Sequence, residues 1–179
     1  SSVSVRQGFL FAALRSLDAS LRLLGSQLVV RAGFPAQELV KLAAESGAEA
    51  VYAEEDYSPY ARRRDAEVSS RLDLHLVVGV TVHHPNAVVK ADGSPYTVFT
   101  PFSKVWKALP FSSYAEKKLT ALPPVPDLVS LPIPDGEAPA GFPASEGEAQ
   151  RRLQDFLNQH ISAYHDAHNR MDLDGTSAL

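Results

Sequence analysis

The first part of the chain alternates between helix-like and strand-like patterns of hydrophobic residues. Its opening helix is predicted by leucines that recur at the spacing of one helix face, namely Leu10, Leu14, Leu17, Leu21 and Leu24. Short apolar runs predict buried strands within residues 27–31, 50–53 and 74–82. Further helices are expected between these strands, one around Leu39 to Ala43 and one from Pro59 through Val68.

This alternation of helices and strands predicts an α/β fold, with a doubly wound parallel sheet of the Rossmann-like kind. We assign residues 1–109 to this domain. Because the chain opens with a helix where such folds usually open with a central strand, we expect an N-terminal strand–helix–strand portion to be missing from it.

A proline-rich stretch separates this domain from a final helical segment. The prolines between residues 110 and 144 exclude a regular helix, so we expect an extended linker that crosses a surface. Ser145 and Glu148 have the spacing of a capping box, which predicts a helix start. The hydrophobic positions that follow, up to Tyr164, lie on one helix face. We therefore assign residues 145–179 to the start of a second, all-helical domain.

Composition removes several classes of function. The 179 residues have a formal net charge of −4 and no cysteine, so there is no disulfide framework and no general attraction to nucleic acid. No membrane span or targeting segment is evident, and we expect a cytoplasmic protein.

His83 and His84 are adjacent, point to opposite sides of an extended segment and have no evident acidic partner. We therefore predict no metal site there, and none at His160, His165 and His168, which are expected on a helix surface.

Two strings identify the chain more closely. The first runs from Gly93 to Phe102 as Gly-Ser-Pro-Tyr-Thr-Val-Phe-Thr-Pro-Phe and is followed by Trp106. The second runs from Tyr164 to Leu179 and ends in Gly-Thr-Ser-Ala-Leu. In this order, the two strings resemble the DNA photolyase/cryptochrome family. The resemblance implies an antenna domain, a linker and the opening of a flavin domain that continues beyond the chain.

The same resemblance implies an FAD site at the end of the chain. In this family a tyrosine at the position of Tyr164 lies against the flavin, and the loop that follows holds the FAD phosphates. The loop residues here are Thr176, Ser177, Ala178 and Leu179, and the last serine of the family motif lies beyond Leu179.

An antenna chromophore is also implied, in the α/β domain. Folate-binding members of the family have Asn-Glu at the positions of Tyr60 and Ala61, and Asn86 stands where deazaflavin-binding members have Asp. We therefore expect a deazaflavin or flavin rather than folate, with Tyr60 stacking on its ring and Asn86 bonding its edge. An empty antenna site remains the alternative. The Arg62–Arg64 run could form an anion patch or a solvated helix face.

The function implied by the resemblance is that of a deoxyribodipyrimidine photolyase. Reduced FAD, excited by blue light, donates an electron to a pyrimidine dimer in damaged DNA, which is bound through the missing C-terminal domain. Because the flavin does the chemistry, we expect no catalytic side chain in this chain, and we infer no protein partner and no membrane. Two alternatives remain, a cryptochrome photoreceptor and an unrelated doubly wound nucleotide-binding module.

Overall fold

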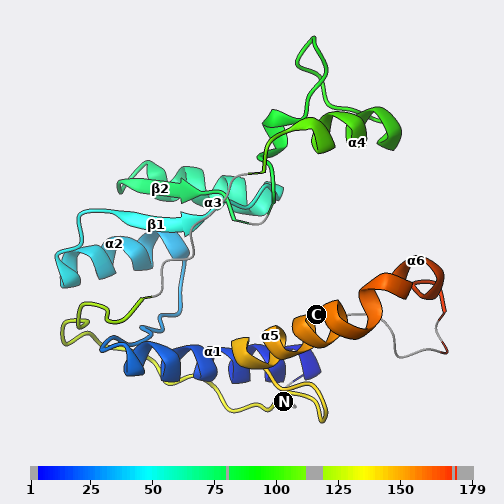
Figure 1. Cartoon of the computed structure of the whole chain (residues 1–179). Coiled ribbons are helices and arrows are strands. Elements are labelled where there is room, and N and C mark those ends of the chain that lie inside the picture. The colour runs from blue at the N-terminus through cyan, green and yellow to red at the C-terminus, as the bar shows by residue number, and fades with distance from the viewer. Residues whose placement is uncertain (1–3, 80, 112–118, 171, 173–179) are drawn as a thin grey trace. The chain divides into compact units, whose positions relative to one another are not determined.

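The computed structural model describes residues 4–79, 81–111, 119–170 and 172 (Figure 1). The chain divides into two compact units. One combines Ser1–Val30 with Leu119–Leu179, and the other is Arg31–Lys118.

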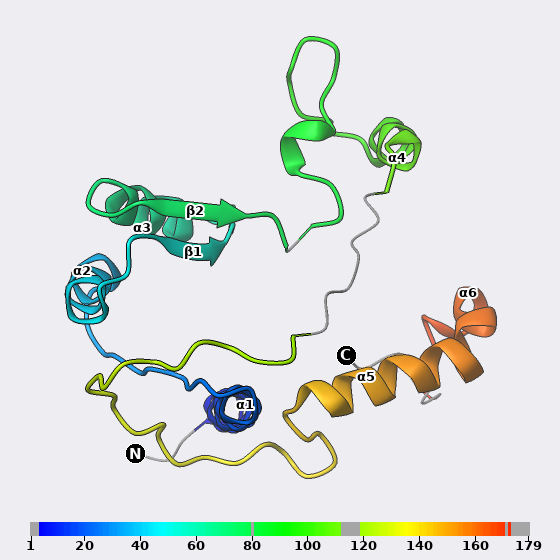
Figure 2. The same ribbon diagram turned by 60° about the vertical axis from the view of Figure 1, so that its left-hand side comes forward.

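The second unit contains the parallel sheet. Its elements follow in the order α2 (Pro35–Ser46), β1 (Val51–Glu54), α3 (Pro59–Ser69) and β2 (Leu74–Val77). β1 and β2 pair in parallel, and the crossover helix α3 contacts both β2 and α2 (Figures 1 and 2). This arrangement confirms the predicted α/β fold.

Local sequence explains where the helices of this unit begin and end. Pro35 and Pro59 occupy first helical positions, where a missing N–H costs nothing. The Ser58 hydroxyl accepts a hydrogen bond from the Ala61 amide at 3.3 Å, which caps α3. Gly47 ends α2 in the left-handed conformation with φ 71°.

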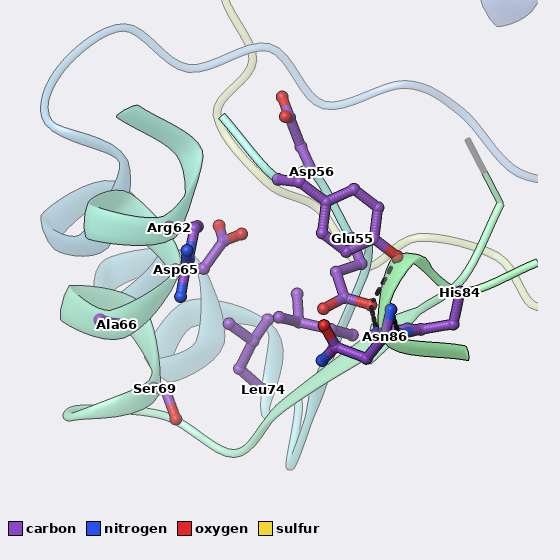
Figure 3. Close-up of a pocket in the computed structure, with 11 residues that line it drawn as sticks. Glu55, Asp56, Arg62, Asp65, Ala66, Ser69, Leu74, His84 and Asn86 are labelled. Atoms are coloured by element: carbon purple, nitrogen blue, oxygen red, sulfur yellow. Dashed lines mark hydrogen bonds and ion pairs between the residues drawn. The ribbon is translucent and has the colours of Figure 1, made fainter. Parts of the chain in front are cut away.

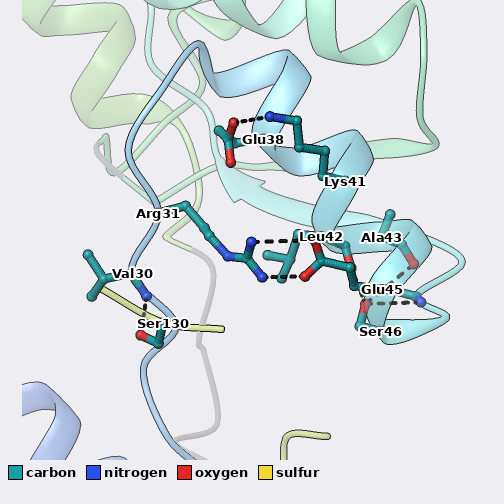
Figure 4. A network of polar contacts seen from close by, with 10 residues as sticks. Val30, Arg31, Glu38, Lys41, Leu42, Ala43, Glu45, Ser46 and Ser130 are labelled. Atoms are coloured by element: carbon teal, nitrogen blue, oxygen red, sulfur yellow. Dashed lines mark hydrogen bonds and ion pairs between the residues drawn. The ribbon is translucent and has the colours of Figure 1, made fainter. Parts of the chain in front are cut away.

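The predicted strand at residues 27–31 does not form. The Val30 carbonyl accepts from the Leu131 amide at 2.9 Å, and the Val30 amide donates to the Ser130 hydroxyl at 2.9 Å (Figure 4). The backbone N–H and C=O of Val30 are therefore both bound by the proline-rich segment, and no strand ladder forms. Arg31, the next residue, forms an ion pair with Glu45 of α2.

The predicted strand at residues 74–82 ends early, at Val77. Its last ladder bond is donated by the Glu55 amide to the Val77 carbonyl at 2.9 Å. After Glu55 the chain turns into α3, so the residues that follow Val77 have no neighbouring strand.

A 3₁₀ turn and one more helix complete this unit. They are η1 (Pro85–Ala87) and α4 (Phe99–Ala108). Trp106 of α4 packs on the rings of His83 and Phe111, with centroids 5.1 and 5.8 Å away. Phe99 lies outside this aromatic cluster and is 76% exposed. It is the first residue of α4, and its aromatic neighbour is Phe102 at 6.4 Å.

The other unit is organised around α1 (Val5–Leu23). Ser4 and Gln7 close a reciprocal capping box at its start. The proline-rich segment 119–139 has no helix or strand, as its prolines predict. It lies along α1, where the Arg15 guanidinium donates to the carbonyls of Pro134, at 2.9 Å, and Gly136.

The last helical segment is interrupted. It consists of α5 (Glu146–Asp155), the π-helical η2 (Phe156–His160), the 3₁₀ turn η3 (Ile161–Ala163) and α6 (Tyr164–Ala167). The prediction of one regular helix from residue 145 through Tyr164 is therefore wrong, because π-helical and 3₁₀ segments interrupt it.

The capping box at the start of α5 is only half formed. The Ser145 hydroxyl accepts from the Glu148 amide at 3.2 Å, but the Glu148 carboxylate binds the guanidinium groups of Arg151 and Arg152 instead. Hydrogen bonds from these two arginines lower the pKa of Glu148 to about 2.

Gly8 of α1 provides a test of this packing. A Cβ at Gly8 would lie 2.4 Å from the Glu137 carbonyl oxygen, whereas a Cβ at Gly147 of α5 would meet nothing within 4 Å. Gly8→Ala is expected to destabilise the protein by about 1–3 kcal/mol through overpacking. Gly147→Ala, the matched control, is expected to be neutral or stabilising by up to about 1 kcal/mol. Urea unfolding followed by circular dichroism measures both, and a stabilising Gly8→Ala would contradict the close approach.

Candidate functional site

The residues that follow β1 and β2 line an open cleft of about 400 Å³ at the carboxyl edge of the sheet (Figure 3). This edge is where parallel α/β folds bind ligands. The lining comes from the segment after β1, from α3, from β2 and from the segment around η1. It consists of Glu55, Asp56, Tyr57, Arg62, Asp65, Ala66, Ser69, Leu74, Leu76, His84 and Asn86.

Glu55 is the polar centre of this cleft. Its Oε2 accepts a hydrogen bond from the Tyr57 hydroxyl at 3.1 Å and lies 3.3 Å from His84 Nε2 (Figure 3). Burial, and then the bond to Glu55, raise the pKa of Tyr57, so the phenol keeps its proton and donates it. The expectation that the histidine pair lacks an acidic partner is therefore wrong for His84, because Glu55 reaches it from the end of a different strand.

His84 connects Glu55 to the 3₁₀ turn η1. Its Nδ1 accepts a hydrogen bond from the Asn86 amide at 3.1 Å, which leaves the proton of a neutral ring on Nε2, the nitrogen that faces Glu55. The Tyr57 ring meets the His84 ring edge-on, with centroids 5.6 Å apart.

The arginine run on α3 does not act as one patch. Arg64 forms a 2.7 Å ion pair with Asp65, which is only 7% exposed. Arg63 bonds the Pro59 carbonyl at 3.1 Å, and Arg62 alone of the three lines the cleft. The neighbouring Asp56 accepts from the Ser58 amide at 2.8 Å, a bond that lowers the pKa of the carboxyl group.

The charges of the cleft lining are therefore mostly acidic. Asp65 is paired with Arg64, which leaves Glu55 and Asp56 facing one arginine of the lining, Arg62. Such a lining suits a neutral ligand that presents N–H or O–H donors, and it disfavours phosphate.

Of the two predicted antenna residues, one lines the cleft and the other does not. Asn86 lines the cleft beside His84, whereas Tyr60 is 65% exposed on the first turn of α3 and is not part of the lining. Glu55, Tyr57 and His84 were not singled out as ligand-binding candidates. The available signal was the position of Glu55 directly after a buried strand, at the edge where ligands bind.

Of the predicted FAD residues, the structure describes Tyr164. It opens α6, is 46% exposed, and its ring lies 5.7 Å from Phe156 and 5.4 Å from His168. Thr176, Ser177, Ala178 and Leu179 lie outside the described residues.

The part of the chain that the structure describes offers neither a metal site nor a membrane span. These residues contain no group of three or more His, Cys, Asp or Glu side chains placed to hold a metal ion. Among the same residues, no helix combines the length and the apolar character that a membrane span requires.

Comparisons with known sequences point to one family. The family model for DNA photolyase matches residues 2–127. A deoxyribodipyrimidine photo-lyase of Synechococcus sp. is 31% identical over 97% of this chain and 40% of its own length. An uncharacterized 31.6 kDa protein of another Synechococcus strain is 32% identical, over 98% of this chain and 66% of its own length. A cryptochrome DASH of Natronomonas pharaonis is 31% identical, over 88% of this chain and 37% of its own length.

Solved structures agree on the fold. A bacterial class III photolyase from Agrobacterium tumefaciens superposes with a TM-score of 0.78 at 22% identity, over 98% of this chain and 40% of its own. A cryptochrome from Synechocystis sp. superposes with a TM-score of 0.75 at 20% identity, over 91% of this chain and 38% of its own. The chain thus spans about 40% of the length of the photolyases that it matches.

The Arg64–Asp65 pair beside the cleft is expected to stabilise α3. Asp65→Asn leaves the Arg64 guanidinium without its counter-charge in a mostly buried setting, so a loss of about 1–3 kcal/mol is expected. Asp73→Asn removes an exposed carboxylate that pairs with His75, and it should change little. Urea unfolding compares the two variants. Equal small effects would show that the Asp65 pair contributes no more than a surface ion pair.

Proposed function

Since this chain belongs to the DNA photolyase family, we propose that it forms the antenna domain and the opening of the flavin domain of a deoxyribodipyrimidine photolyase. FAD, when bound and reduced, would supply the light-driven electron transfer that splits a pyrimidine dimer in DNA. The cofactor supplies this chemistry, and the protein supplies binding and orientation.

The observation that supports this proposal most is similarity along the length of the chain. The family model covers residues 2–127, and the photo-lyase of Synechococcus sp. aligns with 97% of the chain. A cryptochrome photoreceptor is the second candidate, because a cryptochrome DASH aligns with 88% of the chain at the same identity, 31%.

We assign the antenna chromophore to the cleft beside Glu55. A cleft of about 400 Å³ lies within the range of small-molecule sites. Flavin-like rings carry an N–H edge, which the Glu55 carboxylate and the Asn86 side chain could accept. Tyr60 would offer its aromatic face to any part of the ring that extends beyond the cleft. Ala61 is fully buried and has no polar side chain, so it cannot supply the carboxylate that folate-binding relatives place there.

We assign the FAD to the end of the chain. In this proposal Tyr164 packs against the flavin, and Thr176 and Ser177 donate hydroxyl hydrogen bonds to the phosphates, with Ala178 and Leu179 continuing the loop. This chain would supply one wall of that pocket, so we expect it to bind FAD weakly without the rest of the domain.

Repair activity tests the proposed reaction. The full-length protein is expected to split pyrimidine dimers in DNA under blue light and not in the dark, measured by chromatography of the nucleotides. A protein that is fully loaded with reduced FAD but leaves the dimers intact would favour the cryptochrome alternative.

Chromophore analysis tests the antenna assignment. Extraction of the purified full-length protein is expected to release FAD together with a second flavin or a deazaflavin, identified by chromatography and absorbance. Stoichiometric methenyltetrahydrofolate in the extract would contradict the interpretation of Tyr60 and Ala61. An extract with FAD alone would indicate that the antenna cleft is empty in this protein.

A further inference from the structure

We propose that His84 is a proton-sensitive positioning residue, which binds the Asn86 amide beside the cleft only while its imidazole is neutral. Only the identity of the ligand in the cleft depends on the proposed function. The contacts of His84 are formed by residues of this chain and do not depend on that ligand.

The geometry uses both ring nitrogens of His84. Nδ1 accepts from the Asn86 amide at 3.1 Å, and Nε2 lies 3.3 Å from Glu55 Oε2. His84 is also the N-cap of η1, and its carbonyl accepts from the Ala87 amide at 2.8 Å. One tautomer, with the proton on Nε2, satisfies both side-chain contacts. The ring thereby joins the segment after β1 to the segment after β2.

Protonation would affect the two contacts in opposite ways. An imidazolium carries a proton on each nitrogen, so Nδ1 can no longer accept from the Asn86 amide and instead faces it donor to donor. The contact with Glu55 becomes charge-assisted and is retained. Acidification therefore frees the Asn86 amide, while the Ala87 amide still bonds the His84 carbonyl and His84 stays beside Glu55.

Five other ionisable side chains lie around His84. Glu55 and Tyr57 touch it, and Asp56, Arg62 and Asp65 line the same cleft. The raised pKa of Tyr57 keeps that phenol neutral, and the lowered pKa of Asp56 keeps that carboxylate charged. Histidine is the residue type among those lining the cleft that ordinarily titrates between pH 5 and 8.

His75 is a natural control. Like His84, it pairs with a carboxylate, through Nε2 at 3.0 Å from Asp73, and it contacts a tyrosine ring, Tyr52 at 4.8 Å. Unlike His84, it has no backbone amide bonded to its ring among the described residues. Protonation of His75 should therefore leave the backbone near it unchanged.

Nuclear magnetic resonance of the 179-residue chain tests the proposal without any ligand. The ¹⁵N shifts of His84 are expected to show the proton on Nε2 at neutral pH. The Asn86 amide shift should follow the His84 titration. Its exchange with solvent, corrected for intrinsic pH dependence, should become about two- to tenfold faster in the protonated form, the factor expected for one lost hydrogen bond.

Two variants separate the roles of the nitrogens. In His84→Asn the side-chain oxygen can replace Nδ1, so the Asn86 amide should stay protected at every pH. In His84→Gln the amide group can replace Nε2 toward Glu55 but leaves no acceptor at the cap, so Asn86 should exchange fast at every pH. His75→Asn should leave the Asn86 titration unchanged.

Several results would overturn the proposal. They are a proton on Nδ1 of His84 at neutral pH, an Asn86 amide that ignores the His84 titration, and equal exchange in the Asn and Gln variants. Because the wild-type titration needs no substitution, a variant that fails to fold does not remove the test. Absence of an antenna chromophore would refute the assignment of the cleft and leave the His84 result standing.

Discussion

Parallel pairing of β1 with β2 is the constraint on which the cleft depends. The Glu55 amide donates to the Val77 carbonyl at 2.9 Å, so the ladder fixes the backbone of the residue that anchors the polar network. Directly after it, Asp56 accepts from the Ser58 amide and the chain enters α3. The crossover then returns the chain as β2, next to β1. Both strand ends therefore open at one edge, and side chains distant in sequence meet there.

The proline-rich segment is held in place by hydrogen bonds to other parts of its unit. Prolines remove amide donors, so the segment cannot satisfy its carbonyls through a helix or a ladder of its own. Arg15 of α1 takes two of these carbonyls, from Pro134 and Gly136. Gly8, without a side chain, lets the Glu137 backbone approach the helix. Side-chain donors on α1 thus replace the hydrogen bonds that the segment lacks.

The sequence predicted the elements set by local chemistry better than those set by distant partners. α3 begins where Pro59 predicts it, because a fixed φ acts within a few residues, and the Ser58 hydroxyl caps it. The strand expected at residues 27–31 depended on a neighbouring strand, and Val30 bonds the Leu131 backbone and Ser130 instead. For the same reason, the contact between His84 and Glu55 was not visible in the sequence. The placement of Asn86 at the site came from family resemblance rather than from the residue pattern.

The electrostatics of the cleft bear on the proposal that an antenna chromophore and FAD occupy separate sites. In the proposed FAD site, Thr176 and Ser177 would bind phosphate, because hydroxyl groups donate strong hydrogen bonds to anions. Asp65 is neutralised by Arg64, so the cleft presents Glu55 and Asp56 against Arg62, and this small excess of negative charge would disfavour the diphosphate of FAD there. A neutral ring edge would instead gain a carboxylate acceptor that the Tyr57 hydroxyl already orients. In this proposal, charge therefore helps to decide which of two chemically similar rings enters which site.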